Sequence, residues 1–152
     1  MTALADRIAE LLEARGAGFE RQEDDDRIVH LIGPDDEDGD WVVTFLGIED
    51  PHEAVVAYAF APVDCPAEHR GALAELVTRA NLGLGSGCWE LDLDDGELRA
   101  RVGLRLQGQT LSDPLLEGLV AELSDLVEAY GEAALSVMDG EDPAEALDEA
   151  DG

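Results

Sequence analysis

Apolar and charged side chains alternate along residues 89–106, which read WELDLDDGELRARVGLRL. Alternation of this length predicts two β-strands, each with one apolar and one charged face. Asp95-Gly96 lies between them and is typical of a two-residue hairpin turn. This loop length gives the facing pairs Asp92 with Arg99, Glu90 with Arg101, Leu93 with Leu98, Leu91 with Ala100 and Trp89 with Val102. We therefore expect an antiparallel hairpin that keeps its apolar side chains on one face.

Helix and strand signals continue on both sides of this hairpin. Apolar spacing, helix-start residues and glycines predict helices over 3–14, from Asp64-Cys65-Pro66 to Gly83, from Ser112-Asp113-Pro114 to Asp139-Gly140, and from Asp142-Pro143 through Leu147. Apolar runs bounded by turn residues predict strands over 27–32, 41–46 and 55–61. The resulting order, α-βββ-α-ββ-α with tight hairpins, predicts an α+β fold with an antiparallel sheet.

The predicted strand 55–61 has two unlike faces. Val56, Tyr58 and Phe60 share one face, whereas the other consists of the alanines at 57, 59 and 61. Because alanine side chains are small, a helix can approach this second face closely. We expect a single domain over residues 1–147, followed by an acidic C-terminal end at 148–152 that frays.

The chain is strongly acidic: 9 Lys and Arg residues against 37 Asp and Glu residues give a formal net charge of −28. Phosphate contacts need a basic patch, so we expect neither nucleic acid nor an acidic membrane surface as a partner. All positive residues are arginine, a bias that a high-salt habitat, GC-rich coding or an acidic face for a basic partner would each explain. The N-terminus lacks the basic region of a secretion signal, which predicts a cytoplasmic protein.

Several motifs resemble those of the YbjN family of bacterial sensory-transduction regulators. The matching residues are Asn81-Leu82-Gly83, the strand over 87–93, the Asp95-Gly96 turn, the arginine-bearing strand that leads to Leu111-Ser112, and Met138-Asp139-Gly140 followed by the proline-led turn over 142–147. The resemblance implies the fold of class I type III secretion chaperones. It also implies a homodimer and protein binding with regulation instead of catalysis, with no catalytic residues to transfer.

Motifs that would indicate metal, phosphate or nucleophilic chemistry are incomplete. The acidic runs at 92–96 and 36–40 lack the glycine and glutamate positions of a calcium loop. The glycines over 83–87 follow a helix instead of opening one, so they do not form a phosphate loop. Cys65 and His69 are one helical turn apart, but nothing nearby orients the histidine as a base.

Cys65 and Cys88 are too few for a structural zinc site, and we expect both to stay reduced. The prediction is therefore no catalytic residue, no cofactor and no metal. If one side of the sheet is uncovered, the side chains expected to bind a partner are Trp41, Phe45, Tyr58, Phe60 and Arg105.

We thus expect a non-enzymatic, chaperone-like or regulatory module that binds an unidentified protein partner through its sheet or helices. The alternatives are a small acidic enzyme, a carboxylate metal-binding protein, and an acidic decoy for a nucleic-acid-binding protein.

Overall fold

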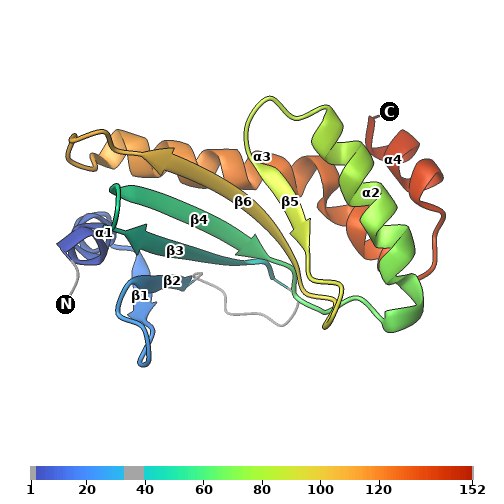
Figure 1. Cartoon of the computed structure of the whole chain (residues 1–152), viewed down its shortest axis with the longest axis horizontal. Helices are drawn as coiled ribbons and strands as arrows, with labels where there is room; N and C mark the ends of the chain where they lie inside the picture. Colours follow the sequence, from blue (N-terminus) through green and yellow to red (C-terminus); the bar gives the residue numbers. More distant parts are fainter. Residues whose placement is uncertain (1–2, 33–39, 152) are drawn as a thin grey trace.

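A computed structural model describes residues 3–32 and 40–151, which form one antiparallel sheet and a set of helices (Figure 1). The strands are β1 (Gly18–Arg21), β2 (Ile28–Ile32), β3 (Val42–Ile48), β4 (Ala54–Phe60), β5 (Cys88–Leu91) and β6 (Leu98–Arg105). The helices are α1 (Ala3–Ala14), the 3-10 turn η1 (Ala67–His69), α2 (Arg70–Leu82), α3 (Asp113–Met138) and α4 (Pro143–Asp151). Within the sheet the strands follow the order β1-β2-β3-β4-β6-β5. The predicted α+β class is confirmed.

All the sheet-packing helices lie on one face of the sheet. α1 packs against β3, where Gly47 leaves room for Leu4 and Ala5, and the long α3 runs along β4 and β6 (Figure 1). Val29, Phe45, Ala57 and Val102 form one row across four strands on this covered face, and each is at most 2% exposed. Ala57 and Ala59 of β4 lie on the covered face, as expected from the sequence, and allow the close approach of α3.

The helix ends follow the predicted signals with local differences. The hydroxyl oxygen of Ser112 caps α3 by accepting a hydrogen bond from the backbone N–H of Leu115 at 3.4 Å. α2 begins at Arg70, after the η1 turn, and therefore one turn later than expected from Pro66. α4 continues to Asp151, four residues past the expected end at Leu147. The short β1 was not predicted, because four residues carry too little alternation to indicate a strand.

The β5–β6 hairpin is confirmed, but its predicted register is wrong by two residues. Glu90 faces Arg99 and Leu91 faces Leu98, whereas a two-residue turn would have placed Glu90 opposite Arg101. The backbone N–H of Asp92 donates to the carbonyl of Glu97 at 2.9 Å, so the loop contains residues 93–96. A shift of two preserves the faces, because side chains alternate with a period of two. Leu93, expected in the apolar face, lies instead in the loop and is exposed.

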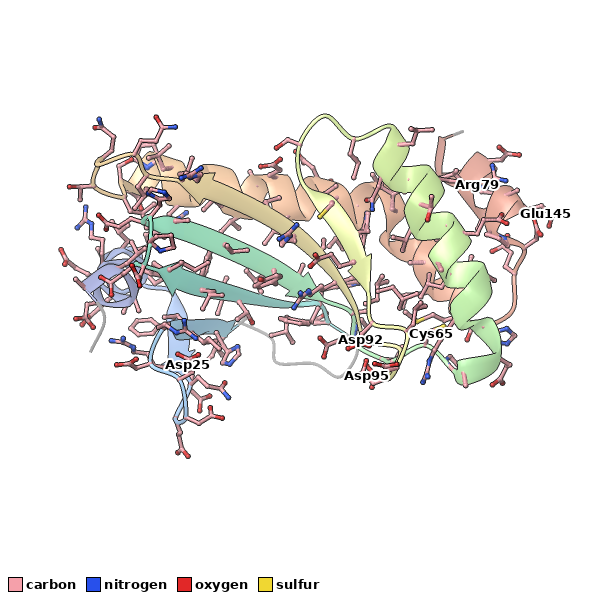
Figure 2. The ribbon with its side chains drawn as sticks, in the orientation of Figure 1. Asp25, Cys65, Arg79, Asp92, Asp95 and Glu145 are labelled. Atoms are coloured by element: carbon pink, nitrogen blue, oxygen red, sulfur yellow. The ribbon has the colours of Figure 1, made fainter. Side chains whose placement is uncertain are left out.

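Contacts with the segment before η1 account for the longer loop. The backbone N–H of Cys65 donates to the carbonyl of Gly96 at 2.8 Å, and the Arg70 side chain donates to the carbonyls of Cys65 and Asp94, each at 3.0 Å. Figure 2 shows Cys65 close to the loop that contains Asp95. Gly96 has φ +82°, and a Cβ there would collide with the Cys65 backbone. Only glycine satisfies both conditions at this position.

Candidate functional site

The face of the sheet opposite the helices is uncovered by any described helix; we call it the open face (Figure 1). It carries apolar rows on either side of a polar pair, His30 and Thr44, whose side chains hydrogen-bond at 2.8 Å. Its apolar side chains from β2, β3 and β4 are Ile28, Ile32, Val42, Leu46, Ile48, Val56, Tyr58 and Phe60. Ile32 is 43% exposed and Val42 is 47% exposed, whereas the remaining six are half-buried by their neighbours. Contiguous exposed apolar side chains on a sheet mark a binding surface more often than isolated ones do.

Two aromatic rings lie at the centre of the open face, next to the arginines of β6. Tyr58 and Phe60 have ring centroids 5.8 Å apart, and the Arg99 guanidinium lies 4.4 Å from the centroid of the Tyr58 ring. This cation–π contact fixes the arginine over the ring. Arg99 therefore marks the boundary between the apolar and charged parts of the face.

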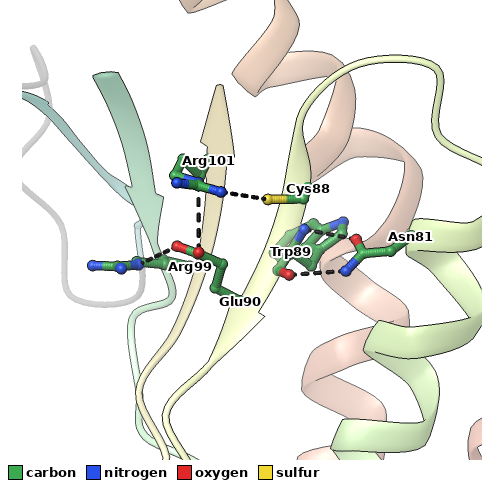
Figure 3. Close-up of polar contacts among 6 residues, drawn as sticks. All are labelled: Asn81, Cys88, Trp89, Glu90, Arg99 and Arg101. Atoms are coloured by element: carbon green, nitrogen blue, oxygen red, sulfur yellow. Dashed lines mark hydrogen bonds and ion pairs between the residues drawn. The ribbon is translucent and has the colours of Figure 1, made fainter. Parts of the chain in front are cut away.

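Glu90 and the β6 arginines form a charged group on β5 and β6 (Figure 3). Oε1 of Glu90 lies 2.8 Å from Nε of Arg99, and Oε2 lies 3.5 Å from Nε of Arg101. Nη2 of Arg101 also donates to the sulfur of Cys88 at 3.7 Å. The Cys88 sulfur and the Glu90 carboxylate raise the pKa of Arg101. Glu90 therefore neutralises only part of this positive charge.

Arg105 has no ion pair or hydrogen bond to any other described residue. It lines a shallow hollow of about 380 Å³ together with Glu49, His52 and Glu53, but none of these side chains forms a salt bridge with it. The open-face strand positions thus carry Arg99, Arg101 and Arg105 against Glu20 and Glu90. These strand positions hold three positive and two negative groups, and Glu49 and Glu53 lie beside Arg105 at the end of the sheet, so the charges are mixed here whereas the whole chain has a net charge of −28.

At Trp89 the outer edge of β5 is closed by a single side chain of α2. Oδ1 of Asn81 accepts a hydrogen bond from the backbone N–H of Trp89 at 2.8 Å, and Nδ2 donates to the Trp89 carbonyl at 3.0 Å (Figure 3). The amide group thereby satisfies both backbone groups that another strand would bind. Sequence reasoning missed this contact, because an asparagine near a helix end is more typical of a cap.

The predicted partner-binding side chains are divided between the two faces. Tyr58, Phe60 and Arg105 lie on the open face. Phe45 is 0% exposed and lies in the covered core. Trp41 packs edge-on against Trp89, with ring centroids 5.5 Å apart, beside Gly131 of α3. Trp41 and Phe45 therefore support the site from within the fold instead of contacting a partner on the open face.

The remaining candidate sites show structural contacts. Cys65 is buried, its thiol donates to the Pro66 carbonyl at 3.5 Å, and burial raises the pKa of this thiol. Both cysteines are free. Within residues 3–32 and 40–151 no group of three His, Cys, Asp or Glu side chains is placed to hold a metal ion. Most of the acidic run at 36–40 falls outside the described residues.

The sheet, with helices on one face and an apolar, arginine-bearing opposite face, defines a one-sided α+β domain. Residues 4–136 match the YbjN family, described as "Putative bacterial sensory transduction regulator", and the chain belongs to this family. The family resemblance seen in the sequence motifs is confirmed.

Solved structures share the fold. The chain is similar to a crystal structure of YbjN from E. coli, described as "a putative transcription regulator", with a TM-score of 0.61 and 15% identity over 88% of each chain. An uncharacterized protein from Methanothermobacter thermautotrophicus is similar with a TM-score of 0.55 and 13% identity, over 88% of this chain and 95% of that chain. No curated protein matches the sequence. None of the described helices is long and apolar enough to cross a membrane.

Proposed function

We propose that this chain is a non-enzymatic regulatory module that binds a segment of another protein on the open face of its sheet. The observation that carries the proposal is the exposure of apolar side chains there, above all Ile32 at 43% and Val42 at 47%. Because about half of each side chain is already covered, a partner that buries the rest contributes on the order of 1 kcal/mol for each one. Several such contacts are needed to exceed the cost of association.

The arginines of β6 give this surface an orientation. An apolar partner segment covers Val42, Val56 and Phe60, while Arg99 and Arg101 present charged groups along one side. Burial supplies affinity, and the charges at the rim select the partner and its direction. The membership of a regulator family is consistent with this kind of binding surface.

The proposal includes a cytoplasmic location and a homodimer, in keeping with the family resemblance. The net charge of −28 disfavours nucleic acid and anionic membranes as partners. Light scattering of the purified chain at about 0.15 M salt tests the homodimer, because at that ionic strength charges beyond about 8 Å are largely screened.

Photo-cross-linking in the native host tests the proposed surface. Benzoylphenylalanine replaces Val42 on the open face, and a matched variant carries it at Leu115 of α3, which is 40% exposed on the helical side. We expect position 42, but not position 115, to cross-link to a defined protein. The purified protein should then bind the native chain and lose affinity for a Val42→Asp variant.

Two results would contradict the proposal. One is equal cross-linking from both positions, which indicates non-specific contact. The other is an absence of cross-links from position 42 in cells where the chain is expressed at its native level. Cross-links from position 42 to a second copy of the chain would show that a homodimer interface, and not a partner segment, covers the open face.

A further inference from the structure

β6 is longer than its neighbour β5, so part of its outer edge has no strand beside it. β5 pairs with β6 only from Cys88 opposite Arg101 to Leu91 opposite Leu98. Before Cys88 the chain turns away at Gly87, where φ is +74° and a Cβ would contact the Arg101 carbonyl and Val102. The edge of β6 from residue 102 to residue 105 therefore has no strand partner among the described residues.

The hydrogen bonds of β6 show which backbone groups face this edge. The Leu98 carbonyl accepts from the N–H of Ala61, and the N–H of Leu106 donates to the Glu53 carbonyl, each at 3.0 Å on the β4 side. Because neighbouring residues of a strand point their backbone groups in opposite directions, even-numbered residues face β4. The N–H and carbonyl groups of Gly103 and Arg105 therefore face outward, where another strand can pair with them.

The side chains next to this edge have a distinct pattern on the open face. Arg101 and Arg105 are both exposed, and Gly103 between them has no side chain. The gap belongs to a shallow hollow of about 430 Å³ that is also lined by Val56, Gly87 and Cys88. The hollow has room for an apolar side chain beside Gly103; Arg101 lines it, and Arg105 follows two residues further along β6.

We propose that an acidic extended segment of a partner protein adds to the sheet as a strand beside Gly103–Arg105. Its backbone pairs with the outward groups of these residues, with a carboxylate opposite Arg105 and an apolar group beside Gly103. Cys88 of β5 occupies the position opposite Arg101, so the segment leaves the edge there, and its next carboxylate approaches the Arg101 guanidinium. This inference rests on the proposed function and names the chemistry of the partner. The competing acids are Glu90, already paired with Arg99 and Arg101, and Glu49 and Glu53 beside Arg105.

A second copy of the same edge cannot pair in register about Gly103, because Cys88 of β5 already occupies the position opposite Arg101 in each copy. Only a pairing shifted by two residues, with Gly103 of one copy opposite Arg105 of the other, fits the unpaired part of the edge. That pairing places no carboxylate opposite either Arg105, whereas an acidic strand does.

Two seven-residue peptides probe the site by NMR on the isotopically labelled full chain. The acidic probe is acetyl-TETLTET-amide and its matched control is acetyl-TKTLTKT-amide. Both sequences are palindromic, so the second, fourth and sixth residues present the same side chains whichever way the peptide runs along β6. We expect the acidic peptide to shift the amide resonances of Gly103 and Arg105 and to bind about tenfold more tightly than the lysine peptide. In the free chain these two amides should exchange with solvent faster than that of Leu104, which faces β4.

Variants separate the contributions of charge and pairing. Arg105→Glu should abolish the preference between the peptides, because each peptide then makes one attractive and one repulsive contact. Arg79→Glu makes the same change in net charge on α2 and should leave the preference unchanged (Figure 2). Gly103→Pro removes one outward N–H and should abolish the shifts. An unchanged spectrum of α3 and β4 would show that the variant is folded.

The outcomes distinguish this inference from the proposed function. Shifts at Val42 and Phe60, with Gly103 and Arg105 unmoved, would overturn the edge site while leaving open-face binding intact. If neither peptide shifts any resonance, the edge site is overturned. Open-face binding is then tested separately by cross-linking from position 42. Slow exchange of Gly103 and Arg105 in a peptide-free dimer would show that a second copy occupies the edge, against the inference.

Discussion

Replacement of Asn81 by alanine tests whether one side chain holds β5 against α2. The variant loses the hydrogen bonds to the N–H and the carbonyl of Trp89, which are 2.8 and 3.0 Å long and part-buried. Each such bond contributes about 1–1.5 kcal/mol when its loss leaves a backbone group without a partner. The better helix propensity of alanine offsets about 0.5 kcal/mol. We therefore expect Asn81→Ala to lower the free energy of unfolding by about 2 kcal/mol.

Urea unfolding followed by tryptophan fluorescence measures this effect, because Trp41 and Trp89 pack against each other in the core. A loss of about 2 kcal/mol corresponds to a fall in the melting temperature of roughly 4–8 °C for a chain of this length. Leu82→Ala is the control, since Leu82 follows Asn81 in the same helix but is 90% exposed. Its free energy of unfolding should stay within about 0.5 kcal/mol of the native value.

A second variant separates hydrogen bonding from packing. Asn81→Asp keeps the acceptor for the Trp89 N–H but places a carboxylate oxygen against the Trp89 carbonyl. The folded state then disfavours the ionised carboxylate, so the deficit should shrink as the pH falls and the acid becomes a donor. If Asn81→Ala instead unfolds within about 0.5 kcal/mol of the native chain, the reasoning about this edge is refuted.

Three further changes test other parts of the structure. Gly96→Ala should cost more than about 2 kcal/mol in urea unfolding, because the added Cβ combines strain at positive φ with a collision at Cys65; Gly85→Ala, with open space around it, should be near neutral. Timed iodoacetamide labelling with mass spectrometry should modify Cys88 before the buried Cys65. Raising the salt from about 0.01 to 0.15 M should raise the melting temperature by screening repulsion among the acids.

The alternation of residues 89–106 predicted the hairpin, its strands and its buried face, but not its loop. Two pairing registers that differ by two residues bury the same side chains, so alternation cannot distinguish them. The observed register depends on the hydrogen bond between the Cys65 N–H and the Gly96 carbonyl, which joins segments about thirty residues apart in the chain. Local turn preference favoured the shorter loop, and this tertiary contact outweighed it.

The division of the aromatic side chains was only partly visible in the sequence. The strand over 41–46 is apolar on both faces, so its own pattern does not show whether Phe45 or Leu46 faces the helices. The alanine face of β4 holds the missing signal, because Phe45 pairs with Ala57. Once the pairing register is known, Phe45 must lie on the covered side and Tyr58 on the open side.

The outer edge formed by β5 and the end of β6 is closed at one place and open at another. At Trp89 the side chain of Asn81 occupies the backbone groups, whereas at Gly103 they stay open between two exposed arginines. Positive charge on an edge strand opposes pairing with a like-charged strand, which protects the chain from polymerising through this edge. The same charge attracts an acidic strand. In the proposed edge site, Arg101 and Arg105 would disfavour self-association through this edge and favour a partner of opposite charge, and replacing both by glutamate should reverse the two effects together.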